Sequence, residues 1–162
     1  MDLQFLLPLA AFLGMIAGII VGMFSKEEFN TNRKYLLIFS RAVLAALIVY
    51  LSYDSGSLIS FLVGLVAGFF LTATYLYLGL AVASTLASPL SFIVSSLVLL
   101  YGIFYGTLAF SRFDWKMVLL HLAVFLLPFS ILMIWPGYSN ALMSLSAGLL
   151  IGSLENKFVR RY

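Results

Sequence analysis

The chain alternates long apolar runs with short polar segments. Each apolar run is close to the roughly 20 residues that a helix needs to cross a ~30 Å hydrocarbon core, and the polar segments carry nearly all of the charge. We therefore predict an all-α fold, a polytopic transmembrane helix bundle of about six spans. The expected spans cover residues 3–24, 35–53, 58–82, 89–111, 117–135 and 141–154, and a basic tail follows at residues 155–162.

Composition supports one integral membrane domain over residues 1–162. Hydrophobic residues make up 64% of the chain and charged residues 9%, whereas about a quarter of the residues of a globular protein are charged. The absence of cysteine excludes disulfides and thiolate metal sites. A formal net charge of +3 is small and scattered. It favours contact with anionic lipid headgroups over binding to nucleic acid.

The stretch from residue 58 to residue 111 contains no charged side chain and is the hardest to divide. It is too long for one crossing, and two helices are the economical interpretation. Small polar residues ahead of Pro89 favour a break there, because proline disfavours helical geometry at the residue before it. A re-entrant segment within residues 77–95 is an open alternative and would change the number of crossings.

The orientation of the bundle follows from its Lys and Arg residues. With six crossings, Arg112, Lys116 and the basic tail lie on the same side as both termini, and the residues 26–34 lie on the other side. This difference of five Lys/Arg against three favours cytoplasmic termini for a multi-pass protein of the cell membrane. The bias is weak, and Arg41 weakens it further.

Small residues recur at intervals of four. The dipeptide Ala-Gly occurs three times, and the positions four residues before and after each of its glycines are also small. Such stripes let two membrane helices approach closely, so the first, third and sixth expected helices should form a packed core. The glycines of these stripes are Gly14, Gly18, Gly22, Gly64, Gly68, Gly148 and Gly152.

A serine face runs along the fourth expected helix. It comprises Ser84, Ser88, Ser91 and Ser95, and continues through Gly102 and Gly106. The face is a candidate lining for a water-filled or solute path, with a cavity bordered by Ser91, Ser95 and Tyr101. The alternative is that these hydroxyls bond to carbonyls of their own helix. Four tyrosines, Tyr75, Tyr77, Tyr101 and Tyr105, could form an aromatic cluster nearby or serve only in packing.

Two ionisable residues fall within the expected spans. Arg41 is expected near the headgroups, where it binds an anionic group or simply snorkels. His121 is expected to relay a proton, to bond a solute, or to bond a backbone carbonyl or a tyrosine. The spans contain no Cys, Asp, Glu or second His, so His121 lacks the other ligands of a metal site. No catalytic motif is present.

These features favour a small transporter, or the membrane-embedded substrate-binding component of one, for a neutral or amphipathic solute. The candidate ligand-binding residues are Arg41, Ser88, Ser91, Ser95, Tyr101 and His121. No cofactor is expected. The alternative is a non-catalytic structural or assembly subunit, whose partners would be membrane lipids, further copies of the chain or other membrane subunits. A lipid-modifying enzyme that uses His121 and Arg41 is a third, less favoured hypothesis.

Overall fold

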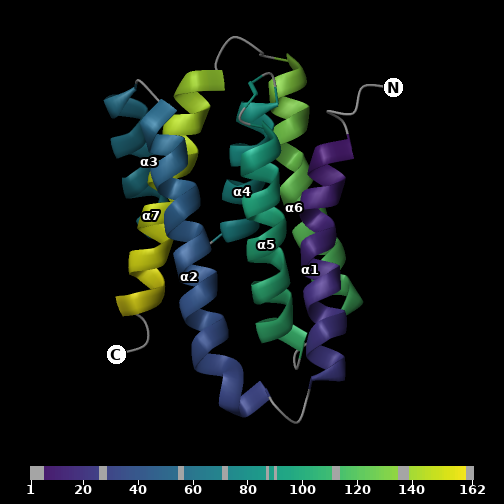
Figure 1. Ribbon diagram of the computed structural model, residues 1–162. Coiled ribbons are helices and arrows are strands. Elements are labelled where there is room, and N and C mark those ends of the chain that lie inside the picture. Colours follow the sequence, from purple (N-terminus) through teal and green to yellow (C-terminus); the bar gives the residue numbers. More distant parts are fainter. Residues whose placement is uncertain are drawn as a thin grey trace.

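The protein is a bundle of helices in the computed structural model (Figure 1). The structure describes residues 6–25, 29–54, 57–70, 73–86, 88–89, 91–110, 114–134 and 139–159, and within these ranges it contains no strand. The helices are α1 (Leu6–Phe24), α2 (Phe29–Asp54), α3 (Leu58–Phe70), α4 (Thr74–Thr85), α5 (Ser91–Ala109), α6 (Trp115–Ile134) and α7 (Ser139–Val159). The expected all-α bundle is thereby confirmed.

Three segments within these helices are long and apolar enough to cross a membrane. They are Leu6–Phe24, Asn32–Tyr53 and Ser91–Ala109. Shorter apolar stretches occur at Leu58–Phe70, Val118–Ser130 and Asn140–Leu154. Together with the composition, these lengths make the chain a helical membrane protein.

The expected single span at residues 58–82 is instead two short helices. α3 has 13 residues and α4 has 12, which correspond to about 20 Å and 18 Å of helix at ~1.5 Å per residue. Neither would cross a ~30 Å hydrocarbon core. α3 runs from the upper end of the bundle to its middle, and α4 returns from the middle to the same end (Figure 1). We call residues 58–85 the re-entrant segment.

The re-entrant segment changes where the ends of the chain lie. α1 begins at the upper end of the bundle in Figure 1, and α7 ends at the lower end. Both termini were expected on one face because six full crossings return the chain to its starting side. The structure has α1, α2, α5, α6 and α7 running the length of the bundle, and this odd number places the two ends apart.

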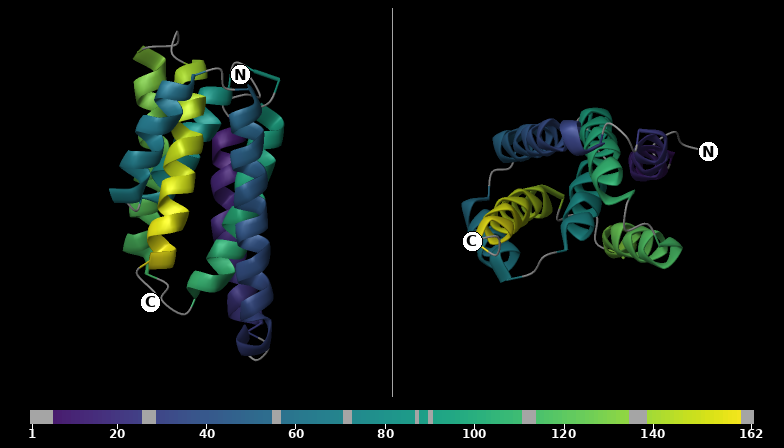
Figure 2. Two further views of the ribbon diagram at one scale, coloured as in Figure 1. Left: turned by 90° about the vertical axis from the view of Figure 1, so that its left-hand side faces the viewer. Right: turned by 90° about the horizontal axis from the view of Figure 1, so that it is seen from below.

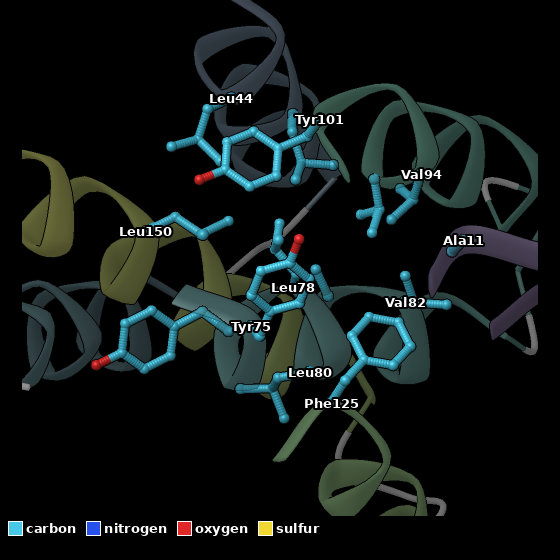
Figure 3. Close-up of a cluster of buried hydrophobic side chains, with 14 of the residues drawn as sticks. Ala11, Leu44, Tyr75, Leu78, Leu80, Val82, Val94, Tyr101, Phe125 and Leu150 are labelled. Atoms are coloured by element: carbon cyan, nitrogen blue, oxygen red, sulfur yellow. The ribbon is translucent and has the colours of Figure 1, made fainter. Parts of the chain in front are cut away.

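α4 occupies the centre of the bundle. Every residue of α4 except Leu76 is buried, and the helix packs against α5, α6 and α7. Side chains from the surrounding helices, among them Leu44, Phe125 and Leu150, gather around Leu78 of α4 (Figure 3). A methyl group at Gly79 would overlap the carbonyl of Phe125, so α6 can lie this close only because position 79 has no side chain.

Glycines set the contacts of two further helix pairs. Gly14 and Gly18 of α1 lie against the carbonyls of Leu99 and Ile103 of α5. In the same way, Gly64 and Gly68 of α3 lie against the carbonyls of Leu145 and Leu149 of α7. Both pairs run parallel from the upper end (Figure 1), and they stand on different sides of α4 when seen from below (Figure 2). One packing arrangement is therefore used twice.

The partner glycines complete each pair. Gly102 and Gly106 of α5 contact the α1 backbone, and Gly148 and Gly152 of α7 contact the α3 backbone. The Thr107 hydroxyl also donates a hydrogen bond to the Gly18 carbonyl at 3.0 Å. The first, third and sixth expected helices thus do not form one packed core, because α1 packs on α5 while α3 packs on α7. Gly102 and Gly106 of α5, which were expected to continue a solute path, belong to the contact with α1.

We expect Gly18→Leu to destabilise the bundle, because the new side chain would overlap the Ile103 carbonyl. Overpacking of this kind costs about 1–3 kcal/mol. Ala17→Leu is the matched control, since Ala17 is exposed on the same helix. Unfolding of the detergent-solubilised variants by heat or SDS measures the difference. Equal midpoints for the two variants would contradict the close contact between α1 and α5.

Candidate functional site

The expected serine face does not lie on one helix: Ser84 belongs to α4, Ser88 to the connection that follows, and Ser91 and Ser95 to α5. Ser91 and Ser95 are 7% and 4% exposed, and Tyr101 on the same helix is 4% exposed. Farther along this face, Gly102 and Gly106 touch the α1 backbone. The Ser84 hydroxyl donates to the Ala81 carbonyl of its own helix at 3.0 Å. The Ser95 hydroxyl, in contrast, is buried with no hydrogen-bond partner among the described residues. Bonding of a hydroxyl to its own helix is therefore seen at Ser84 and not at Ser95, and the expected cavity bordered by Ser91, Ser95 and Tyr101 stays a prediction.

Ser88 and Arg41 do not belong to the cluster of aromatic rings around His121. Ser88 is in the connection between α4 and α5, where its N–H donates to the Thr85 carbonyl at 2.9 Å. Arg41 is exposed on α2 and falls near the middle of the candidate span Asn32–Tyr53. Arg41 lies farther from the start of its helix than expected, because α2 begins at Phe29, ahead of the expected residue 35.

His121 belongs to a cluster of aromatic rings from three helices. Its imidazole lies edge-on to the Tyr75 ring of α4, with ring centroids 4.8 Å apart. The Tyr105 ring of α5 lies 5.3 Å from Tyr75 and 6.3 Å from His121. Tyr101 stacks on the far side of Tyr105 at 6.0 Å. Two of the tyrosines and the histidine that the sequence suggested separately thus form one group, which we call the tyrosine–histidine cluster: Tyr75, Tyr105 and His121.

The Tyr75 hydroxyl is the unusual atom of this cluster. The residue is only 4% exposed, and its hydroxyl has no hydrogen-bond partner among the described residues. Tyr101 is equally buried, but its hydroxyl is hydrogen-bonded to the Ser40 side chain of α2. An unsatisfied buried hydroxyl costs about 1–3 kcal/mol. Such a group in an otherwise packed interior calls for an explanation.

Tyr75 stands at the start of a helix that begins inside the bundle. The residue before α4, Ala73, makes no side-chain capping bond, and its φ and ψ are −107° and 62°. The Ala73 carbonyl accepts from the N–H groups of Leu76 at 2.9 Å and Tyr77 at 3.3 Å. The N-terminal end of a helix carries a partial positive charge of about half an elementary charge. This end of α4 therefore offers a positive potential in the middle of the bundle.

Tyr75 also contacts an apolar group of phenyl rings. The Phe12 ring of α1 lies 6.1 Å from Tyr75 and 5.8 Å from Phe125 of α6, and Phe129 follows 5.9 Å beyond Phe125. Phe12 and Phe125 are both buried. The site therefore combines a polar hydroxyl and a helix N-terminus with a wall of phenyl rings.

The described residues supply hydroxyl, imidazole and backbone groups to the site. Within the part of the chain that the structure describes, no three His, Asp or Glu side chains come together as metal ligands would. Arg41 and His121, the pair that a lipid-modifying enzyme would use, belong to α2 and α6, which stand on opposite sides of the bundle (Figure 2). The structure does not bring these two residues together.

Sequence reasoning missed two parts of the site. Phe12 was treated only as part of an apolar span, and the start of α4 was hidden inside the expected span at residues 58–82. Residues 69–76 (FFLTATYL) contain neither proline, glycine nor charge to mark a turn. The available signal was the pair of threonines, Thr72 and Thr74, since threonine is a poorer helix former than the surrounding leucines.

Comparison of the chain with protein-family models, with curated proteins and with solved structures finds no match. No relative therefore indicates a ligand or a reaction for this bundle. The assignment of the site depends on its geometry.

We expect Tyr75→Phe to stabilise the ligand-free protein by about 1 kcal/mol or more, because it removes an unsatisfied buried hydroxyl. Tyr101→Phe should destabilise it by about 1 kcal/mol, since it breaks the hydrogen bond to Ser40. The two variants make the same chemical change at equally buried sites. Equilibrium unfolding in mixed micelles compares them. A loss of stability in Tyr75→Phe would show that the hydroxyl is paired.

Proposed function

We propose that the protein is a membrane-embedded solute-binding protein of the transporter class, for a neutral or amphipathic solute. The solute binds where α4 begins, beside the tyrosine–histidine cluster. One observation carries the proposal: the buried hydroxyl of Tyr75, the second residue of a helix that begins inside the bundle, has no hydrogen-bond partner among the described residues. A solute oxygen or nitrogen is the group that such a hydroxyl lacks.

The re-entrant segment supports this proposal on physical grounds. Hydrocarbon satisfies no backbone hydrogen bonds, so a helix end at membrane depth is tolerated where it is buried in protein or lines a cavity. Many transporters build their binding sites from discontinuous helices near the bilayer midplane. α4 begins in the middle of the bundle (Figure 1), and Thr74 and Tyr75 at its start are buried.

The Lys and Arg residues favour a single orientation for this architecture. In sequence, Lys26 falls between α1 and α2, and Arg33 and Lys34 fall in the first two turns of α2. Arg112 and Lys116 fall around the start of α6, and Lys157, Arg160 and Arg161 fall at or after the end of α7. These helix ends lie at the lower end of the bundle (Figure 1), and Arg41 falls farther along α2. The connections at the upper end contain neither Lys nor Arg. Positively charged connections face the cytoplasm. We infer five full crossings of the cell membrane, with the end of α7 in the cytoplasm and the beginning of α1 outside.

This topology replaces the expected six crossings with both termini in the cytoplasm. Six crossings divided the basic residues between the two sides, and the re-entrant segment brings them to one side. α3 and α4 then enter from the outer face and return to it. The end of α4 that carries Tyr75 points toward the cytoplasmic half of the bundle.

A structural or assembly subunit is the second candidate function. α3 packs extensively only on α7. Its outer side chains are exposed, and the exposed fractions of Leu58, Ile59 and Phe70 are 72%, 77% and 72%. The last carbonyls of a helix have no partners within that helix, and α3 ends partway through the bundle. Native mass spectrometry distinguishes this candidate, because an assembly subunit would remain oligomeric after extraction and a self-sufficient binding protein would be monomeric.

We expect reporters at the two ends of the chain to lie on opposite sides of the membrane. Green fluorescent protein fused after residue 162 should fluoresce, and alkaline phosphatase fused ahead of residue 1 should be active. The reciprocal fusions should be silent. Cytoplasmic signals at both ends would contradict the five-crossing topology and restore an even number of crossings.

We expect at least one neutral or amphipathic metabolite in a thermal-shift screen to stabilise the purified wild-type protein but not Tyr75→Phe. A ligand at 100 times its Kd adds about 2.7 kcal/mol, which is readily detected. Tyr53→Phe, at the exposed end of α2, is the control and should respond like the wild type. Uptake of the hit into proteoliposomes then tests transport. A broad panel with no Tyr75-dependent hit would overturn the proposed function.

A further inference from the structure

We propose that two copies of the chain associate side by side in the membrane, with the outer face of α2 in each copy packed on the outer face of α3 in the other. This inference goes beyond the proposed function and does not depend on the solute site. Three features carry it: the position of one charge, the depth at which α3 ends and the sizes of the side chains on the two outer faces.

Arg41 places a positive charge on the outer face of the bundle at membrane depth. Its side chain is exposed and falls near the middle of the candidate span Asn32–Tyr53. Charged side chains within membrane spans almost always face protein or water, and they pair with another charge or with backbone carbonyls. A guanidinium carries several N–H donors, so a contact within its own copy leaves donors for a further group. The outer face of α2 is therefore suited to a protein partner that supplies acceptors.

The end of α3 supplies such acceptors at the same depth. α2 ends and α3 begins at the upper end of the bundle (Figure 1). Asp54 ends α2 13 residues after Arg41, and α3 is 13 residues long and ends at Phe70. At ~1.5 Å per residue, both positions lie about 20 Å along their helices from that end. The last carbonyls of a helix accept no bond from their own helix, and this end carries a partial negative charge. It is therefore the electrostatic complement of a guanidinium.

The second copy is the partner that brings these two groups together. Within one copy, α2 packs on α5 and α7, whereas α3 packs extensively only on α7. A two-fold axis along the membrane normal keeps every residue of the second copy at its own depth, and an isologous interface repeats each contact twice. Contact between the two α2 helices would instead oppose two Arg41 charges. Contact between the two α3 helices would place two negative helix ends together.

The side chains on the two outer faces also complement each other in size. α2 and α3 run in opposite directions (Figure 1). Alignment at this depth therefore sets Ala45 opposite Val66 and Ala42 opposite Phe69. Both alanines are exposed, and the exposed fractions of Val66 and Phe69 are 56% and 40%. Small residues let membrane helices approach closely, so the alanines of α2 leave room for the bulkier side chains of α3.

Engineered cysteines test the contact directly, because the natural chain contains no cysteine. Ala45→Cys and Val66→Cys, each with a different tag, would be coexpressed and oxidised in intact membranes. We expect a disulfide-linked product that joins the two tags, and little product from either variant with itself. Leu119→Cys, exposed on α6, is the control and should give no product with either position. Intact membranes are required because charge–dipole contacts weaken when water replaces hydrocarbon.

Substitution of Arg41 tests the role of the charge. Arg41→Gln should lower the yield of the product that joins positions 45 and 66 about fivefold or more, because it removes the charge opposite the helix end. Arg41→Lys keeps the charge and should retain most of the product. Lys34→Gln, at an exposed position on the same helix, is the matched control and should leave the yield unchanged.

Each other outcome has a distinct meaning. A dominant product of Ala45→Cys with itself would overturn the pairing of α2 with α3. A product joining positions 45 and 66 that Arg41→Gln leaves unchanged would overturn the role of the charge. Absence of this product with both oxidation and a bifunctional maleimide would overturn the association of copies and would leave the outer face of α2 to lipid. The metabolite screen tests the proposed function separately.

Discussion

The close approach of helix backbones at glycine is the contact on which the rest of this bundle depends. Lipid tails are as apolar as leucine, so membrane helices gain little by exchanging lipid for one another unless their backbones pack closely. Here that packing occurs at the α1–α5 and α3–α7 pairs, and at Gly79 where α4 meets α6. These contacts fix the outer helices around a central helix that does not cross the bundle. α4 could not begin at mid-depth without such a shell, because its first backbone groups would meet lipid.

The helices packed around α4 also explain how the interior can keep an unfavourable group, the Tyr75 hydroxyl. In the part of the chain that the structure describes, the buried Tyr75 hydroxyl has no hydrogen-bond partner, although the Tyr101 hydroxyl nearby is hydrogen-bonded to Ser40. Stability alone would select phenylalanine at position 75. Binding sites commonly retain groups that reduce the stability of the empty protein, because those groups are satisfied only by the ligand. The tight glycine contacts provide the stability that such a site requires.

The sequence predicted the helical class and most helix ends, and it failed at one turn. Charged segments marked the connections around residues 26–28 and 112–114, and Trp135 with Pro136 marked another. The turn between α3 and α4 has no such marker, because packing of α3 on α7 and burial of α4 determine it. The glycine spacing showed which positions lie close to another helix, but it did not show which helix that is. Serines and glycines on one face of α5 were consequently taken as one surface, although Gly102 and Gly106 belong to the contact with α1.

The sequence identified only part of the candidate site, because it did not predict the turn between α3 and α4. Tyr75, Tyr105 and His121 stand out in the sequence as polar aromatic residues within apolar runs. Their proximity depends on the reversal of the chain at the start of α4, which no local pattern indicates. The uneven distribution of Lys and Arg held a further clue. It becomes one-sided only when residues 58–111 cross the membrane once.

The pairing of α3 with α7 also has a consequence for biosynthesis. α3 is made early and α7 last, so most of the chain must emerge before Gly64 and Gly68 can meet Leu145 and Leu149. Until then α3 is a short apolar helix without its partner, and α4 lacks both α6 and α7. Arrival of α7 therefore supplies the helix on which α3 packs and completes the surroundings of α4.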